Sequence, residues 1–571
     1  MVDRSKPWLR FQISRRWFTF GLVLIAISGL FALYRSTPYG LGLTNDSASY
    51  VNGAVNLLSG NGYTRTSGGG ELKPLTHFPP LMSFSLALLG LFFGNTVPAM
   101  LSTGRGLIVF LFGLDAFLVG LLLIRITRSP VFSWLGALVF AFSDILLGVY
   151  SYYLSEPLFI TLFLAGFLAL AIFFEKRTWP GLVAAGLVCG LAYLARYVGL
   201  SLVASILLVF FLLDVRWGGA ADSPPGRPPS SPGLFTVPIR SFFPEVTLFG
   251  AGALLPVIVW SLVSLASSGT VANRLVVWHP ISPAELFEAL KNLLAWLAPD
   301  DLLAAQPFWG RLLSALSLAV LPVLAVFSLW VLLRQVRARK TGSAISPALS
   351  TAFALAVHVW VYIVFLILSI SLIDASTPLD ARILSVAFIP LMILVISAIA
   401  WLWERLKQGI SWRKSGARAG LALLALALAV VSVKDGLRVV NQLGHQGQGF
   451  AYQGIVESSV IQSIQKMPPV IIYTNKPAVV YLLTGRPAYV TPTPVDAATT
   501  QARTGFDADF NTLRASLLSG KSVLVLFDLA RAKDPNEIAF NLKMSAGLVC
   551  MTDSGFAQIY TLAGSQPDLQ K

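Results

Sequence analysis

Carboxylates and arginines stand beside the ends of long apolar runs in this sequence of 571 residues. Asp46 follows the first apolar run, and Glu156 stands at the start of a later one. A positioned carboxylate can take a proton from a hydroxyl group. Arginine binds phosphate oxygens in pairs because its planar guanidinium presents donors in a fixed fork. Together, these residue types could deprotonate an acceptor hydroxyl and hold an anionic leaving group.

The residues that could take part in this chemistry are spread from position 46 to position 382. They are Asp46, Tyr50, Lys73, His77, Arg105, Glu156, Arg196, Asp374, Asp380 and Arg382. A single arginine at a helix end has an ordinary explanation, since its long side chain can reach the membrane surface. For three such arginines beside acidic residues, a shared anionic ligand is as good an explanation as contact with the membrane surface.

Both acids also have a structural explanation. Residues 44–47 are Thr-Asn-Asp-Ser, and Asn45, Asp46 or Ser47 could cap the helix that follows. Glu156 stands just before a proline, and an acid there suits the positive end of a helix dipole. The residues by themselves leave capping and catalysis open.

Composition identifies the class of protein that must position these residues. Hydrophobic residues make up 55% and charged residues 12% of the chain, and the mean hydropathy is +0.72. These values lie far outside the balance of soluble proteins. The net charge of +15 does not indicate a nucleic-acid partner, because Lys and Arg cluster in short segments between apolar runs. The sequence therefore predicts a polytopic α-helical membrane protein.

The distribution of Lys and Arg predicts about eleven transmembrane helices, with a cytoplasmic N-terminus and an extracytoplasmic C-terminus. The first apolar run, residues 17–33, is expected to be retained rather than cleaved. The run at residues 81–94 spans only about 21 Å as a helix, which is short for a crossing. We predict a half-helix there, which puts Arg105 on the same outer side as Asp46.

Two predicted domains follow from the hydropathy pattern. Residues 1–445 form the transmembrane domain, with a first outer loop at 35–80, a Pro/Ser/Gly-rich cytoplasmic linker at 214–244 and an outer loop at 267–308. Residues 452–467 have the pattern of an amphipathic helix, and residues 470–473 and 522–527 that of buried strands. Residues 446–571 are therefore predicted to form an α/β domain outside the membrane.

Several short motifs occur in a recognisable order along the chain. They are Asp46-x-x-x-Tyr50, Gly60-x-Gly62-Tyr63, His77-Phe78-Pro79-Pro80-Leu81, Arg105, Ser155-Glu156-Pro157-Leu158, Gly190-Leu191-Ala192-Tyr193-Leu194-Ala195-Arg196 and Asp380-Ala381-Arg382. In order and spacing, they resemble the GT-C superfamily of membrane glycosyltransferases, which use polyprenyl-phosphate-linked donors. The similarity is greatest to the branch of protein O-mannosyltransferases and lipid A aminoarabinose transferases, and to uncharacterised bacterial members.

The resemblance implies roles for individual residues. Asp46 matches the acid that acts as catalytic base, Glu156 matches the second acid, and Arg105 matches an arginine near the lipid phosphate. The predicted substrate-binding residues are Tyr50, Lys73, His77, Arg105, Arg196 and Arg382.

The sequence departs from the superfamily pattern at one position. Many members carry a second acid directly after the first, where this chain has Ser47. The change leaves the acceptor open among protein hydroxyls, a glycolipid and a cell-wall polymer. It also removes a possible metal ligand, so we expect no metal or other cofactor.

We predict a glycosyltransferase in the cell (plasma) membrane. It would move a sugar from a polyprenyl-phosphate donor to an acceptor hydroxyl at the outer face, with inversion, and would contact membrane lipids but no nucleic acid. One alternative is a ligase or polymerase that uses polyprenyl-diphosphate oligosaccharides. Another is a transporter of lipid-linked glycans, which would need ionisable groups at mid-membrane, whereas those of this chain are expected at helix ends.

Overall fold

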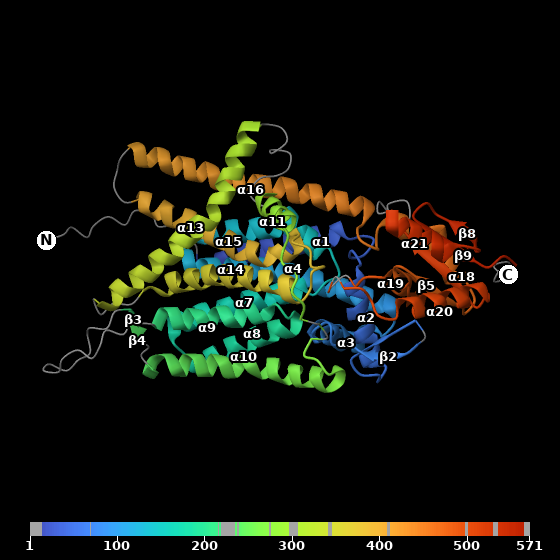
Figure 1. Cartoon of the computed structure of the whole chain (residues 1–571). Helices are drawn as coiled ribbons and strands as arrows, with labels where there is room; N and C mark the ends of the chain where they lie inside the picture. Colours follow the sequence, from blue (N-terminus) through green and yellow to red (C-terminus); the bar gives the residue numbers. More distant parts are fainter. Residues whose placement is uncertain are drawn as a thin grey trace, which may run out of the picture.

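Long helices run side by side through most of the molecule, and a smaller mixed sheet lies at one end of the bundle (Figure 1). The computed structural model describes residues 14–68, 70–214, 216–217, 235–236, 239–272, 274, 276–295, 307–340, 345–407, 412–496, 499, 501–528 and 535–564. Most of the predicted linker 214–244, and residues 296–306 of the predicted loop 267–308, lie outside these ranges.

Within the described ranges, eight helices are long and apolar enough to cross a membrane. They belong to α1 (Arg15–Ser36), α4 (Val97–Thr127), α7 (Glu156–Lys176), α10 (Ile239–Ser268), α13 (Pro307–Lys340), α14 (Pro347–Leu372), α15 (Ala381–Lys407) and α16 (Trp412–Gln446). A bent pair, α5 (Pro130–Ala141) and α6 (Asp144–Tyr150), brings the count to nine.

Three further apolar helices are shorter: α3 (Leu81–Phe93), α8 (Trp179–Ala195) and α9 (Gly199–Asp214). If α8 and α9 also cross, the total matches the eleven crossings predicted from charge, a number that stays a prediction. Helix α3 has 13 residues, or about 20 Å, against about 30 Å of hydrocarbon. It packs beside α2 (Asn45–Leu58) rather than running the length of the bundle (Figure 1).

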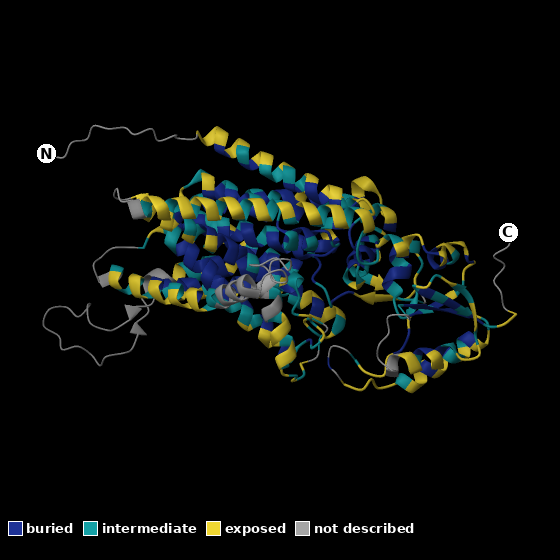
Figure 2. Cartoon of the chain, turned by 90° about the horizontal axis from the view of Figure 1, so that it is seen from above, coloured by how far each residue is buried: buried dark blue, intermediate teal, exposed yellow. Residues whose placement is uncertain are grey.

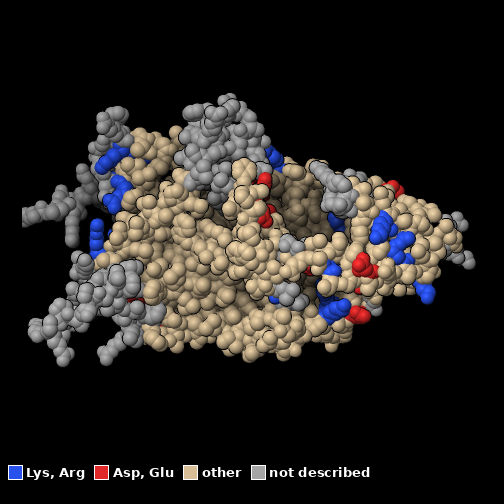
Figure 3. All heavy atoms as spheres, viewed as in Figure 1, with Lys and Arg blue, Asp and Glu red and all other residues tan. Residues whose placement is uncertain are grey.

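The surface of the bundle has the character of a lipid-facing surface. Leu255 of α10, Val326 of α13 and Leu423 of α16 are all exposed, as are many residues along the outer helices (Figure 2). On the face shown in Figure 3, Lys and Arg gather near the two ends of the molecule, and few charges lie between them. Charged side chains are costly in hydrocarbon, so this band is the part that lies in the membrane.

Helix α2 begins with a capping box. The Thr44 hydroxyl accepts a hydrogen bond from the backbone N–H of Ser47 (3.4 Å), and the Ser47 hydroxyl accepts one from that of Thr44 (2.9 Å). The cap is therefore Thr44, and the prediction that Asn45, Asp46 or Ser47 is the capping residue is wrong. A capping box satisfies both donors by itself, which leaves the Asp46 carboxylate available for other partners.

A small hairpin follows α2. Strands β1 (Thr64–Thr66) and β2 (Leu72–Pro74) pair antiparallel, and the side chains of Asn52 and Asn56 bond to the first of them. A second short pair, β3 (Arg216–Trp217) and β4 (Phe235–Thr236), lies within the predicted linker.

The C-terminal sheet has the strand order β6-β5-β7-β9-β8. Its strands are β5 (Ile471–Thr474), β6 (Tyr489–Val490), β7 (Ser522–Phe527), β8 (Val549–Asp553) and β9 (Ala557–Thr561). Strands β5, β6 and β7 run parallel to one another, and β9 pairs antiparallel with both of its neighbours, β7 and β8. The accompanying helices are α17 (Gln453–Val456), α18 (Ser459–Lys466), α19 (Pro477–Thr484), α20 (Phe506–Leu518) and α21 (Pro535–Ser545), while α11 (Pro283–Ala295) lies in the bundle region.

The predicted amphipathic helix at residues 452–467 is two helices, α17 and α18. The chain breaks between them because Ser458 caps the second: its side chain accepts a hydrogen bond from the backbone N–H of Ile461. Helix α19 contacts α2, so the sheet sits against the end of the bundle that carries α2. We call this end the domain end.

Three loops are joined by backbone hydrogen bonds at the domain end. Gly42 donates to the carbonyl of Ser151 and accepts from the N–H of Tyr153, both at 2.8 Å, and Phe450 donates to the carbonyl of Leu43 at 2.9 Å. The approach is close: a Cβ at Gly42 would lie 2.6 Å from the Gln448 side chain. This three-loop tie fixes the segments that lead into α2, α7 and the C-terminal sheet.

Candidate active site

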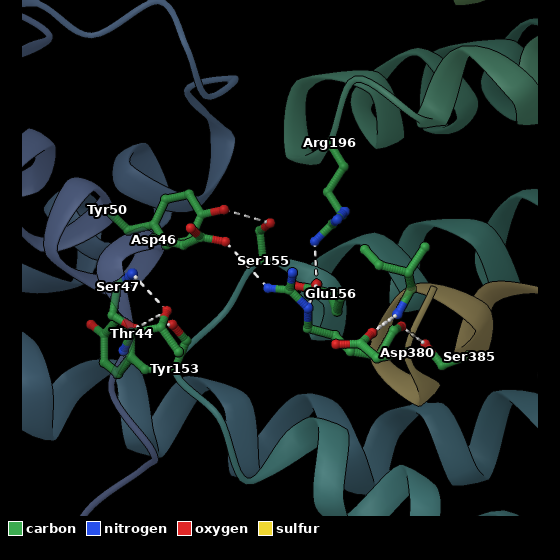
Figure 4. A network of polar contacts seen from close by, with 12 residues as sticks. Thr44, Asp46, Ser47, Tyr50, Tyr153, Ser155, Glu156, Arg196, Asp380 and Ser385 are labelled. Carbon is green, nitrogen blue, oxygen red and sulfur yellow. Dashed lines mark hydrogen bonds and ion pairs between the residues drawn. The ribbon is translucent and has the colours of Figure 1, made fainter. Parts of the chain in front are cut away.

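Two carboxylates and two arginines form one ion-pair network at the domain end (Figure 4). Arg382 Nη1 lies 3.3 Å from Asp46 Oδ2, and Arg382 Nε lies 3.6 Å from Glu156 Oε1. Arg196 forms an ion pair with the same oxygen of Glu156. The Glu156 side chain is 1% exposed and that of Asp46 is 31% exposed. Glu156 is therefore the enclosed member of the network, and Asp46 is the accessible one.

Each of the four residues is held by a different helix end. Asp46 is in the first turn of α2, where the Ser47 hydroxyl donates to the Tyr153 carbonyl at 2.7 Å. Glu156 is the first residue of α7. Arg196 caps the C-terminus of α8, whose helix ends there because its backbone is extended.

The start of α15 positions Arg382. The Asp380 carboxylate accepts a hydrogen bond from the N–H of Ile383 at 3.0 Å, and the Ser385 hydroxyl donates to the Arg382 carbonyl at 2.6 Å. Tyr50, one turn after Asp46, shares a hydrogen bond of 2.9 Å with the hydroxyl of Ser155. The hydrogen bond from Tyr50 thus links α2 to the loop that carries Glu156.

Asp46 faces a cavity of about 350 Å³, within the range of small-molecule sites. Its charged or ionisable lining comes from Asp46, His77, Arg196 and Arg274. The rest of the lining includes the hydroxyl residues Tyr50, Ser155, Tyr197, Tyr362, Ser369 and Thr377 and the apolar residues Phe78, Pro79, Phe365 and Leu366. One space therefore offers a carboxylate, guanidinium groups, hydroxyl groups and an apolar wall.

The environment of Asp46 changes its basicity. Burial and the charge of Glu156 raise the pKa of Asp46, whereas the charges of Arg382 and Arg196 lower it. Burial is the largest of these effects, and the pKa is raised overall. A carboxylate with a raised pKa is a better proton acceptor than a free aspartate once it is ionised.

Arg274 is a cavity residue that the sequence analysis missed. It forms an ion pair with Asp374, and its Nη2 lies 3.2 Å from Nε2 of His77. The loop that carries it is fixed by backbone hydrogen bonds, from Val277 to the Leu372 carbonyl and from His279 to the Ser371 carbonyl. One signal was available: Arg274 is the only Lys or Arg between positions 240 and 291.

Two predicted binding residues belong neither to the cavity wall nor to the ion-pair network. Arg105 donates to the Thr37 hydroxyl at 3.1 Å and to the Tyr34 carbonyl at 3.0 Å, and its guanidinium stacks on the Tyr34 ring at 4.4 Å. Lys73 lies on the exposed hairpin, 3.5 Å from Glu71. Tyr50, His77, Arg196 and Arg382, by contrast, lie in the cavity wall or the network beside it.

Asp115 of α4 and His358 of α14 are ionisable residues that lie within candidate spans rather than at their ends, contrary to the prediction. Asp115 of α4 is fully buried, and its Oδ2 accepts from the Tyr150 hydroxyl at 2.6 Å and lies 3.0 Å from the Thr161 hydroxyl. It does not line the cavity. Across the described residues, no group of three or more His, Cys, Asp or Glu is placed to hold a metal ion.

The helical bundle has the fold of solved GT-C glycosyltransferases, so the predicted resemblance is confirmed at the level of the fold. No family model matches the sequence, and no curated protein matches it. The likeness is to solved structures.

One is ArnT from Cupriavidus metallidurans bound to undecaprenyl phosphate, with a TM-score of 0.57 and 11% identity, over 96% of this chain and 99% of that one. Another is the oligosaccharyltransferase of Archaeoglobus fulgidus in its apo form, with a TM-score of 0.55 and 12% identity, over 90% of this chain and 70% of that one. The same enzyme (AglB) in complex with an inhibitory peptide and a dolichol-phosphate gives a TM-score of 0.53 at 12% identity, with the same coverage.

Proposed function

We propose that this chain is a membrane glycosyltransferase that moves one sugar from a polyprenyl monophosphate to an acceptor hydroxyl at the outer face of the cell membrane, with inversion. The observation that carries the proposal is the pairing of an accessible Asp46 with an enclosed Glu156 through Arg382, beside a cavity lined by further arginines. Such a site needs one base and one cationic group for the leaving phosphate.

In this proposal, Asp46 takes the proton of the acceptor hydroxyl. The acceptor oxygen forms a bond to the anomeric carbon while the bond from that carbon to the phosphate oxygen breaks, and the phosphate leaves with the electron pair. Attack opposite the leaving group inverts the anomeric configuration. Arg382 orients Asp46, and Glu156 holds Arg382 and Arg196 in place.

We place the donor phosphate at the guanidinium groups of Arg196 and Arg274, which line the cavity. The first prenyl units would pack against the apolar part of the cavity wall, which is formed by Phe78, Pro79 and Phe365. The bound undecaprenyl phosphate of ArnT and the dolichol-phosphate complex of AglB support a lipid phosphate in this fold. Arg105 would first have to give up its bonds to Thr37 and Tyr34, so we assign it a structural role.

The second candidate is transfer of an oligosaccharide from a polyprenyl diphosphate, since one neighbour is an oligosaccharyltransferase. A cavity of about 350 Å³ favours the smaller group. The acceptor stays open among a protein, a glycolipid and a cell-wall polymer. Transport of a lipid-linked glycan is not favoured, because Asp115 and His358, which lie within candidate spans, are fully buried and do not line the cavity.

The donor class is tested with the purified full chain in lipid nanodiscs. We expect polyprenyl phosphate to bind, and labelled polyprenyl-phosphate monosaccharides to be consumed with formation of a glycosylated product. A polyprenyl-diphosphate oligosaccharide serves as the comparison donor. Transfer from the diphosphate donor alone would establish the ligase instead, and flux across vesicles without a transfer product would establish transport.

The pH dependence tests the role of Asp46. The carboxylate must be ionised to accept a proton, and its pKa is raised, so transfer should fall as pH decreases through a value above about 3.9, the ordinary pKa of aspartate. The rate of a single turnover, measured across pH at saturating donor, gives the position of this acid limb. An acid limb at or below the ordinary value would contradict Asp46 as the base.

A further inference from the structure

Arg274 and Asp374 form an ion pair at the cavity, and only Arg274 lines the cavity itself. Asp374 has further hydrogen bonds on the side away from Arg274. Arg274 lines the cavity, whereas Asp374 lies behind it with its side chain 13% exposed. Oδ2 of Asp374 faces Arg274. Oδ1 accepts two other hydrogen bonds, from the backbone N–H of Ser376 at 3.1 Å and from its hydroxyl at 2.6 Å. Asp374 therefore keeps two hydrogen bonds when Arg274 turns away.

The charges of the site give a reason for Arg274 to turn away. Within the described site, every guanidinium already faces a carboxylate: Arg196 faces Glu156, Arg382 faces both Asp46 and Glu156, and Arg274 faces Asp374. An incoming phosphate therefore finds no uncompensated positive charge. Glu156 is enclosed between two arginines, and Asp46 is the proposed base, so Asp374 is the carboxylate that can release its partner at the smallest cost.

We propose that Asp374 occupies Arg274 in the free enzyme and is displaced from it by the phosphate of the lipid donor. The inference rests on the proposed function, because it assigns Arg274 to that phosphate. Burial raises the pKa of Asp374, but the hydrogen bonds from Ser376 and the charge of Arg274 outweigh it, so its pKa is lowered and the group stays anionic. Asp374 thus competes with the donor phosphate for the guanidinium of Arg274.

Breaking the Arg274–Asp374 pair costs the same for donor and product, but the displaced carboxylate stays near the phosphate and repels the more highly charged ligand more strongly. The donor is a phosphodiester with one negative charge, whereas the released polyprenyl phosphate is a monoester with a charge of about −1.5 to −2 at pH 7. Without a competitor, the arginines would hold the product more tightly than the donor. When Asp374 returns to Arg274, it replaces the product phosphate and favours its release.

The test measures binding of polyprenyl phosphate, without sugar, to the full chain in nanodiscs of neutral lipid. Asp374→Asn should tighten binding by about fivefold to tenfold, because the competing charge is removed. Arg274→Gln should weaken binding, and adding Asp374→Asn to it should restore nothing. Asp374→Asn should also make turnover more sensitive to added polyprenyl phosphate. Asp496→Asn, which breaks an exposed ion pair with Arg503, is the matched control and should leave binding unchanged.

The outcomes separate the inference from the proposed function. Weaker or unchanged binding by Asp374→Asn, with wild-type thermal stability, would overturn the competition and leave Asp374 as a support for the loop of Arg274. A wild-type chain that binds no polyprenyl phosphate would refute the proposed function itself. A gain of binding in Asp374→Asn that persists in the Arg274→Gln background would also overturn the inference, since the gain would not pass through Arg274.

Discussion

Replacing Asp46 with asparagine is expected to lower the transfer rate by about 10²-fold to 10⁴-fold, the usual contribution of a general base. Asparagine has nearly the same size, and its oxygen can still accept the hydrogen bond from Arg382 that now measures 3.3 Å. What it lacks is the ability to take a proton. The measurement is single-turnover transfer from a labelled polyprenyl-phosphate monosaccharide.

The control for Asp46→Asn is the neighbouring position on the same helix. Asn45 is exposed and precedes Asp46 in the first turn of α2, so Asn45→Ala should transfer sugar at close to the wild-type rate. The affinity for polyprenyl phosphate should change little in Asp46→Asn, because the phosphate is assigned to Arg196 and Arg274. An Asp46→Asn enzyme that folds normally and transfers at the wild-type rate would remove Asp46 from the mechanism.

Replacing Glu156 with alanine is expected to cost about 3–5 kcal/mol of folding free energy, as is typical when one member of a buried ion pair is removed. Glu156 is 1% exposed and is the carboxylate partner of Arg196. Its loss leaves the guanidinium of Arg196, which is only 21% exposed, without a counter-charge and frees Arg382 to move away from Asp46. We therefore expect lower thermal stability and loss of transfer together.

A double variant separates the two effects of Glu156. In Glu156→Gln/Arg196→Gln, both charges of the ion pair are gone, so stability should recover in part, but transfer should not, because Arg382 is no longer positioned and the donor phosphate has lost Arg196. Glu175 at the other end of α7 is the matched control, since it also faces two arginines, Arg125 and Arg128. Glu175→Gln should leave transfer largely intact. Full activity in the double variant would show that Glu156 matters only for folding.

The class of fold could be predicted from the sequence because it depends on properties that single segments carry. Apolar length and the positions of Lys and Arg identify spans, whatever their partners. Apolar length and charge position also predicted that Asp46, Glu156, Arg196 and Arg382 lie at helix ends, and the structure brings these four residues together. It depended on the superfamily resemblance to choose catalysis over capping for Asp46.

What could not be predicted depends on contacts between distant segments. Arg105 looked equivalent to Arg196 from its place at a helix end, yet it bonds to the end of α1. Arg274 stood in a long loop with no periodic pattern, and its pairing with Asp374 depends on how that loop lies against α14. Asp115 sits within a span, where Tyr150 and Thr161 donate hydrogen bonds to one of its two carboxyl oxygens, a partial compensation that no single apolar run reveals.

The three-loop tie has a consequence for how the C-terminal sheet is attached to the enzyme. The chain enters that region through Gly449 and Phe450, and Phe450 donates to the carbonyl of Leu43, the residue just before the cap of α2. On the other side, Gly42 is bonded to the loop that leads into α7 and Glu156. A force applied to the sheet, for instance by a bulky acceptor that binds there, is therefore transmitted through these three hydrogen bonds to the segments that carry both acids. The C-terminal sheet is therefore coupled mechanically to the proposed active site, rather than being an appendage on a flexible tether.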